Sequence, residues 1–171
     1  MKEKWKDKLS KKAIDDIKFY SALVLCLGVF ALVHKFIVYP SIVSGASMED
    51  NFHSGNLMVC ARIHSADFIE RYDVVTADWD GTQIVKRVVG LPGETIQIAG
   101  GAIFVNGEKI EDPYKNSDSF LPGIAKNPVV LGENEYFLIG DNRNNSDDSR
   151  FHVGVVTYDE LMGKVLFKIG K

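Results

Sequence analysis

A serine in a glycine-containing turn is the first candidate for chemistry in this chain. The segment Ser44-Gly-Ala-Ser47-Met-Glu-Asp-Asn51 can present the Ser47 hydroxyl outward. A tight turn also leaves the serine's own N–H free to donate to an oxyanion. Short Gly-Ala-Ser strings are common in ordinary loops as well. Ser47 is therefore a candidate nucleophile only if the chain also supplies a base.

Lys86 is the candidate base. It stands in Gln83-Ile-Val-Lys-Arg-Val-Val89, a β-branched run in which its stem can face apolar neighbours. A lysine must be neutral to accept a proton, and lowering its pKa from ~10.4 to ~8 requires about 3.3 kcal/mol of preferential penalty on the charged form. Burial in an apolar site can supply that penalty, whereas an ordinary strand lysine stays solvated.

A third polar segment, residues 140–150, follows the apolar run at residues 136–139. Its oxygen-rich side chains could form a calcium loop. However, Arg143 and Arg150 place cations where a calcium site would repel them, and the EF-hand spacing is missing. We therefore interpret this segment as the hydrogen-bonded wall of an active site.

Neither the histidines nor the cysteines form a recognisable reactive pattern. His53 and His64 are separated by 11 residues, unlike the zinc-binding HExxH spacing, and His34 and His152 lie in no triad pattern. Cys26 lies in an apolar run and Cys60 outside it, so no disulfide framework is expected, and Cys60 fits a small buried hydrophobe. The sequence predicts neither a metal nor an organic cofactor.

An apolar segment that precedes all three polar segments is predicted to span a membrane. Residues 19–39 form a helix of about 21 residues, or ~31 Å, close to the ~30 Å hydrocarbon thickness. Lys35 can snorkel to the headgroups, Tyr20 and Tyr39 suit the interface, and Pro40 ends the helix. The alternatives are a cleaved signal peptide, which would need a small-residue cleavage site, and a buried core helix, which would show a polar face.

The charge distribution predicts the orientation and excludes one class of partner. Residues 1–39 carry eight lysines and four acids, so residues 40–171 carry twelve basic and nineteen acidic residues. The lysine-rich residues 1–18 predict a cytoplasmic N-terminus and an extracytoplasmic domain at residues 40–171. A domain this acidic repels phosphate backbones, which argues against a nucleic-acid partner.

Residues 40–171 are predicted to be mainly β. Asn106-Gly107 between two short apolar runs is a strong hairpin signal, because a type I′ turn needs positive φ at both positions. Residues 113–128 read as a long loop. Gly, Pro, Asn and Asp clusters separate the expected strands, which lie at residues 57–60, 73–77, 83–89, 95–98, 102–105, 136–139 and 164–169.

Four segments, taken in order, resemble the conserved boxes of type I signal peptidases. Residues 44–48 resemble the nucleophile box, and Arg71-Tyr-Asp-Val-Val75 is similar to the next, usually written Arg-Gly-Asp followed by two hydrophobic residues. Residues 86–93 look like the general-base box, and residues 140–150 match the last box almost completely. The resemblance covers nearly the whole chain, and its short length and single span look like the Gram-positive branch.

The resemblance implies an antiparallel β-sheet or barrel-like catalytic domain with a Ser–Lys dyad. Ser47 would be the nucleophile, Lys86 the general base, and Ser146 a hydroxyl that hydrogen-bonds and orients the lysine. Met48 and Phe52 would line substrate pockets or dip into lipid. The supporting polar residues, which would hold the geometry through ion pairs, are Asp141, Asp148, Arg150 and Arg87.

The chain departs from the family pattern in three places. After Ser47-Met48 the usual x-Pro-Thr-Leu is replaced by Glu49-Asp-Asn-Phe52, which removes the proline restraint and the threonine hydroxyl. Gly45 stands two residues before the nucleophile, so a serine donor to the oxyanion found in some members is absent and the second donor is unidentified. Glu94 stands where Asp is common.

Together these features predict a membrane-bound signal peptidase I whose partners are the lipid bilayer and exported preproteins. An extended substrate segment would pair with an edge strand, and small side chains would fit shallow apolar pockets. A different class of function is a membrane-anchored assembly factor, for example pilus-associated, with little hydrolysis. The altered residues 49–52 motivate it, while retention of all three of Ser47, Lys86 and Ser146 argues against it. A self-cleaving repressor-type Ser–Lys protease would share the dyad but would have no reason for a membrane span.

Overall fold

The structure is a computed structural model that describes residues 2–49, 51–115 and 117–170, with the backbone alone for residues 2–10. Asp50, within the departing segment, and Asn116, within the predicted loop at 113–128, therefore lie outside the described residues. The chain divides into two compact units, Met1–Val38 and Tyr39–Lys171, and each is described by itself.

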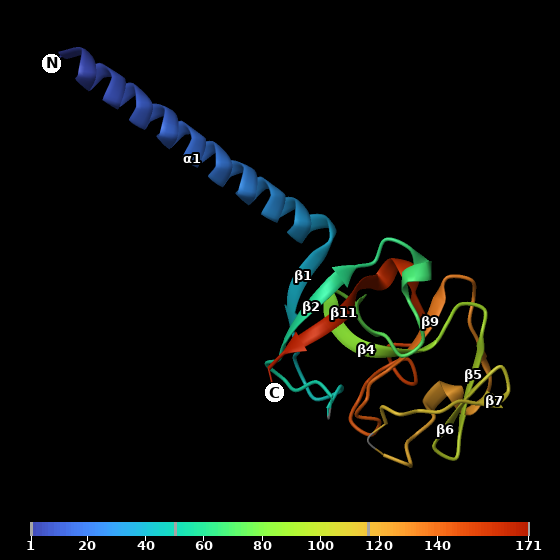
Figure 1. The fold of residues 1–171 in the computed structure, drawn as a ribbon. Helices are drawn as coiled ribbons and strands as arrows, with labels where there is room; N and C mark the ends of the chain where they lie inside the picture. The colour runs from blue at the N-terminus through green and yellow to red at the C-terminus, as the bar shows by residue number, and fades with distance from the viewer. Residues whose placement is uncertain (1, 50, 116, 171) are drawn as a thin grey trace. The chain divides into compact units, whose positions relative to one another are not determined.

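The first unit consists of one long helix, α1, which spans Lys2–Phe36 (Figure 1). Within its stretch Lys11–Phe36, an 18-residue window has a mean hydropathy of 1.9, and the helix is long and apolar enough to cross a membrane. Its large apolar side chains are exposed, with Leu25 and Phe30 at 68% and 69%. Exposed apolar side chains over a helical stretch long enough to cross a bilayer are suited to lipid.

The predicted end of this helix is wrong. The helix stops at Phe36, and Val38–Ile42 forms strand β1 at the edge of a sheet. An edge strand tolerates Pro40, because one side of its backbone has no ladder partner. Tyr39 is not an interfacial residue: it is buried, with its hydroxyl 2.5 Å from the Thr76 hydroxyl. Tyr39 therefore packs in a core cluster of the β domain instead of prolonging the helix.

The second unit is mainly β, as predicted, and its larger sheet has seven strands in the order β1-β2-β11-β3-β4-β9-β10. All the recorded pairings between neighbouring strands of this sheet are antiparallel. Besides β1, its strands are β2 (Leu57–Arg62), β3 (Val74–Trp79), β4 (Thr82–Gly90), β9 (Glu135–Ile139), β10 (Val156–Thr157) and β11 (Leu161–Ile169).

A smaller sheet has the order β7-β6-β5-β8. Its strands are β5 (Thr95–Ala99), β6 (Ala102–Val105), β7 (Glu108–Lys109) and β8 (Val129–Val130). The predicted hairpin joins β6 to β7, with φ of 53° at Asn106 and 85° at Gly107. The predicted loop at 113–128 contains a short 3₁₀ helix, Gly123–Lys126; two others are Ala66–Phe68 and Tyr158–Glu160.

One apolar cluster joins the two sheets. Val89 of β4 and Phe137 of β9 pack with Ile96, Ile98 and Ile103 of the smaller sheet, and all five are at most 1% exposed. Strand β4 runs from the larger sheet to this junction (Figure 1). The middle of β4, which carries Lys86, is therefore held on both sides by packed strands.

Candidate active site

The predicted nucleophile and base meet in the structure. Lys86 Nζ donates a hydrogen bond to Ser47 Oγ across 2.8 Å. Lys86 pairs with Val75 in the β3–β4 ladder and is 5% exposed, so its stem and amine are enclosed by the sheet. The sequence left a solvated strand lysine as the alternative, and the geometry excludes it.

Burial lowers the pKa of Lys86. Removing the ammonium from water penalises its charged form, and this is the largest effect. The Asp148 and Asp147 carboxylates act in the opposite direction and raise the pKa, while the Arg150 guanidinium lowers it. The net effect is a lowered Lys86 pKa, which makes the neutral amine, the form that can accept a proton, easier to reach.

Asn142 holds the peptide groups around Ser47. Its backbone N–H donates to the Ser47 carbonyl at 3.0 Å, and its side-chain Nδ2 donates to the Ala46 carbonyl at 3.0 Å. In a trans peptide the C=O and N–H point in opposite directions. Anchoring the Ala46 carbonyl on this wall therefore turns the Ser47 N–H to the other side, where it is available as an oxyanion donor. Gly45 takes a φ of 90° in the preceding turn, a conformation that glycine adopts at little cost.

The wall behind the dyad depends on a buried ion pair between Asp148 and Arg150. Arg150 Nε and Nη2 each donate to the carboxylate at 2.8 Å, and both side chains are 0% exposed. Asp148 also accepts the Gly140 N–H at 3.0 Å, and Arg150 Nη2 donates to the Arg143 carbonyl at 2.8 Å. Two charges that are both buried and fully hydrogen-bonded act as a rigid brace for the loop.

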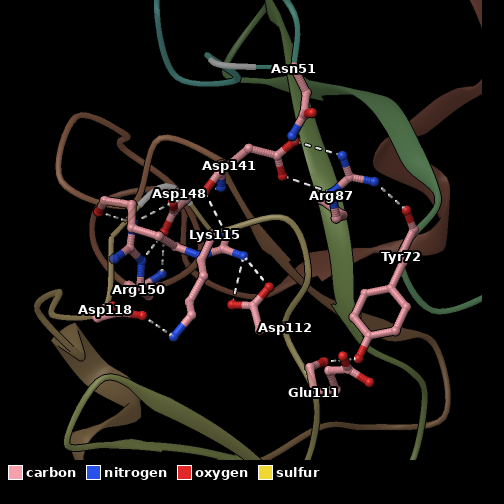
Figure 2. Close-up of polar contacts among 12 residues, drawn as sticks. Asn51, Tyr72, Arg87, Glu111, Asp112, Lys115, Asp118, Asp141, Asp148 and Arg150 are labelled. Carbon is pink, nitrogen blue, oxygen red and sulfur yellow. Dashed lines mark hydrogen bonds and ion pairs between the residues drawn. The ribbon is translucent and has the colours of Figure 1, made fainter.

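A second ion pair links β4, the strand that carries Lys86, to the segment that follows Ser47. Arg87 donates to Asp141 through Nε at 2.7 Å and Nη2 at 2.6 Å, and Asn51 Nδ2 donates to the same carboxylate at 2.9 Å (Figure 2). Asn51 stands where the family pattern has threonine, so an amide donor replaces the missing hydroxyl. The altered segment thus keeps a hydrogen bond to the wall through Asn51. This weakens the reason for expecting a non-hydrolytic protein.

The predicted hydrogen bond between Ser146 and Lys86 is not made in this structure. The Ser146 hydroxyl oxygen is buried and has no hydrogen-bond partner. It lies against the backbone of Gly140, where a Cβ would come within 2.2 Å of it. The hydroxyl is therefore in the wall beside the dyad, but its side chain is not aimed at the lysine.

Met48 and Phe52, which were expected to line substrate pockets or dip into lipid, are both at least partly buried. Met48 is 1% exposed and does not reach the surface, as contact with lipid would require. Phe52 is half-buried and packs against the cluster formed by Tyr39, Val43, Met58 and Cys60. Cys60 is fully buried, as predicted, and burial raises the pKa of its thiol to about 11.

Several residues of the site carried no distinguishing signal in the sequence. Asp112 accepts from Arg143 Nη2 at 2.7 and 2.9 Å, and the Tyr114 ring centre lies 3.6 Å from the Arg87 guanidinium. Both lie outside the four family-like segments. Glu94, by contrast, stands within a family-like region at a position where Asp is common. It forms an ion pair with Arg71, with contacts of 2.5 and 3.0 Å.

Two of the three acids in the 140–150 segment are already committed to arginines, and the third, Asp147, lies beside His152. Asp141 is paired with Arg87, and Asp148 with Arg150. Within the described residues, no group of three or more His, Cys, Asp or Glu side chains is placed to hold a metal ion. The segment is built as a hydrogen-bonded wall, in agreement with the interpretation of its sequence.

Comparisons with known proteins identify the family to which this site belongs. The family model described as "Signal peptidase, peptidase S26" matches residues 17–169. The chain is 33% identical over 168 residues to signal peptidase I P of Bacillus subtilis subsp. natto, covering 92% of this chain and 90% of the relative. It is 31% identical over 166 residues to signal peptidase I S of Bacillus subtilis, covering 92% and 89%.

A solved structure agrees with this assignment. The chain is similar to a signal peptidase I from Enterococcus faecalis, with a TM-score of 0.50 and 28% identity, over 58% of this chain and 97% of that one. The sequence relatives and the solved structure thus point to the same kind of protein. The chain belongs to the signal peptidase family, peptidase S26.

Proposed function

We propose that this protein is a membrane-anchored serine endopeptidase that removes N-terminal signal peptides from exported preproteins by means of a Ser47–Lys86 dyad. The observation that carries the proposal is the 2.8 Å contact between Lys86 Nζ and Ser47 Oγ in a setting where the lysine is 5% exposed. The sequence relatives are signal peptidases, which supplies the reaction class and the substrate.

The reaction uses the neutral amine twice. Lys86 accepts the Ser47 proton while Oγ attacks the scissile carbonyl carbon, and the resulting ammonium returns that proton to the leaving amine. The Ser47 N–H donates to the developing oxyanion, in the orientation that the Asn142 contact favours. Lys86 then takes a proton from the water that attacks the acyl ester, and returns it to Ser47 Oγ as the ester bond breaks.

The wall residues act by position. Arg87 and Asp141 join the base strand to the nucleophile segment, and Asp148 and Arg150 brace the loop that carries Asn142. The substrate lies extended along a strand edge, and its small side chains fit where larger ones are excluded.

The protein is held by α1 with the lysine-rich end in the cytoplasm and Tyr39–Lys171 on the outer side, where exported preproteins emerge. The bilayer and the preprotein are its partners. The acidic balance of residues 40–171 suits neither DNA nor RNA.

The test is cleavage of a preprotein or signal-peptide substrate by the full chain in detergent or lipid, comparing wild type with Ser47→Ala and Lys86→Ala. The dyad predicts cleavage by the wild type alone, at a site that mass spectrometry of the product places after a small residue. Cleavage that survives either substitution would rule out the dyad. A folded wild type that cuts no such substrate would favour an assembly role.

A further inference from the structure

Tyr72 adopts a backbone conformation that a bulky residue rarely takes. Its φ is 75°, in the left-handed region, where a side chain with a Cβ is strained. Glycine is the usual residue at the matching position of the family-like segment 71–75. This chain therefore accepts strain that a glycine would avoid, which calls for a compensating contact.

The Tyr72 backbone forms hydrogen bonds with residues of β4 that follow Lys86. Its N–H donates to the Val88 carbonyl at 2.8 Å, and its own carbonyl accepts from Arg87 Nη1 at 2.7 Å. A glycine in the same conformation could make both of these bonds. The backbone alone does not explain the tyrosine.

The Tyr72 side chain reaches a segment that glycine could not. Its hydroxyl donates to the Glu111 carbonyl (Figure 2). Its ring centre lies 5.7 Å from that of Tyr114. The Tyr114 ring in turn covers the Arg87 guanidinium at 3.6 Å. Burial raises the pKa of Tyr72, so the phenol keeps the proton that it donates.

Segment 111–114 is fastened to the wall at a further point. Asp112 pairs with Arg143, whose side chain is 0% exposed and whose Nη1 donates to the Gly140 carbonyl at 2.6 Å. The segment thus covers two guanidiniums of the wall, those of Arg87 and Arg143. Both arginines contact the loop that positions Ser47, one through Asp141 and the other through Gly140.

We propose that Tyr72 is a positioning residue. Its side-chain contacts with Glu111 and Tyr114, here called the latch, hold segment 111–114 over the Arg87–Asp141 pair and thereby hold the wall that aligns Ser47. The inference rests on the proposed function. Opening the latch exposes Arg87 to water, loosens its grip on Asp141, and frees both Asn51 and the neighbouring Asn142, which holds the Ala46 and Ser47 carbonyls. The loss falls on alignment of the nucleophile rather than on substrate binding.

The experiment measures kcat, KM and melting temperature for the full chain in detergent, as wild type, Tyr72→Phe and Tyr72→Gly. Tyr72→Gly relieves the backbone strain and is expected to melt no lower than wild type, while kcat falls on the order of tenfold with KM nearly constant. Tyr72→Phe keeps the ring against Tyr114 and loses only the hydroxyl, so its kcat is expected to lie between the two.

Asp80→Gly is the matched control. Asp80 has a φ of 50° in the exposed turn between β3 and β4, so this substitution relieves the same kind of strain away from the wall. It is expected to leave kcat and KM as in wild type. Hydrogen exchange of the amides in 111–115 gives a readout without turnover, and exchange is expected to be faster in Tyr72→Gly than in wild type or Asp80→Gly.

Wild-type kcat in Tyr72→Gly, or unchanged exchange in 111–115, would overturn the latch. The latch would also be overturned if kcat and melting temperature fell together in both Tyr72 variants. A purely structural role predicts that kcat falls only where stability falls. Failure of the proposed function has a different signature, namely cleavage by Ser47→Ala or none by wild type, and the exchange measurement then still decides whether the latch exists.

Discussion

Gly140 is the position where one added methyl group should separate activity from folding. A Cβ built there would lie 2.4 Å from the Ser47 carbonyl oxygen, about 0.6 Å inside the 3.0 Å limit below which real Cβ contacts are essentially never found. It would also lie 2.2 Å from the Ser146 hydroxyl, which can rotate away. The Ser47 carbonyl is backbone and is held by the Asn142 N–H, so in Gly140→Ala the nucleophile loop itself must move.

The expected loss follows from that displacement. A misplacement of about 1 Å in an active site can cost about a hundredfold, so a shift of about 0.6 Å predicts a fall in kcat on the order of tenfold. Overpacking adds a stability cost of about 1–3 kcal/mol. The assay is kcat and KM on a signal-peptide substrate, with urea unfolding monitored in parallel by circular dichroism.

Two other glycines provide controls. At Gly90 a Cβ would lie 2.7 Å from Leu131 Cδ1 and 2.8 Å from Phe137 Cβ, so Gly90→Ala strains the core by a similar amount but leaves the nucleophile loop alone. At Gly132 the nearest atom, at 3.3 Å, belongs to the flexible Glu135 side chain. Gly90→Ala should lose stability with little change in kcat, and Gly132→Ala should lose neither. If folded Gly140→Ala turned over at the wild-type rate, the wall would not be positioning Ser47 and the reasoning would be refuted.

Three further changes have defined outcomes. Asp147→Asn removes a carboxylate that raises the Lys86 pKa, so the acidic limb of the kcat/KM pH profile, where activity is lost as the amine protonates, should move to lower pH. An acidic limb that stays at the same pH or moves to higher pH would contradict the assignment of Lys86 as base. Asp148→Ala leaves Arg150 buried and unpaired and should cost about 3–5 kcal/mol in urea unfolding, whereas Asp118→Ala, at an exposed pair, should give no resolvable change. Asn51→Thr keeps a donor toward Asp141 and should retain activity, while Asn51→Leu removes it and should lose about 1 kcal/mol of stability along with activity.

The strands were predictable because their physical signals are local. Each apolar run proposed from the sequence became a strand, and Asn106-Gly107 formed the hairpin that its φ preferences favour. The same signal stands at Asp80-Gly81, which turns β3 into β4. The boundary of the helix was not predictable in this way, because apolar residues suit lipid and a protein core equally. Only tertiary packing shows that Tyr39 belongs to the core.

The site was predictable where chemistry restricts residue type, and not where geometry decides. Ser47 and Lys86 were proposed from the sequence because few residues can serve as nucleophile and base. The Ser146 hydroxyl, by contrast, depends on one rotamer, which a sequence does not specify. Asp112 and Tyr114 come from a segment whose pattern is that of any polar loop, and they become part of the wall only because the smaller sheet folds back against Arg143 and Arg87.

The pairing of carboxylates with arginines explains how a charged wall can surround a base that must stay neutral. A bare Asp148 carboxylate near Lys86 would stabilise the ammonium and oppose the effect of burial. Arg150 lies on the same carboxylate and pushes the Lys86 pKa the other way, so it offsets part of the effect of Asp148 at the amine. Desolvation then prevails. The wall can therefore carry the hydrogen bonds that orient the nucleophile loop while the Lys86 pKa stays below its usual value, an effect that an isolated carboxylate in the same place would oppose.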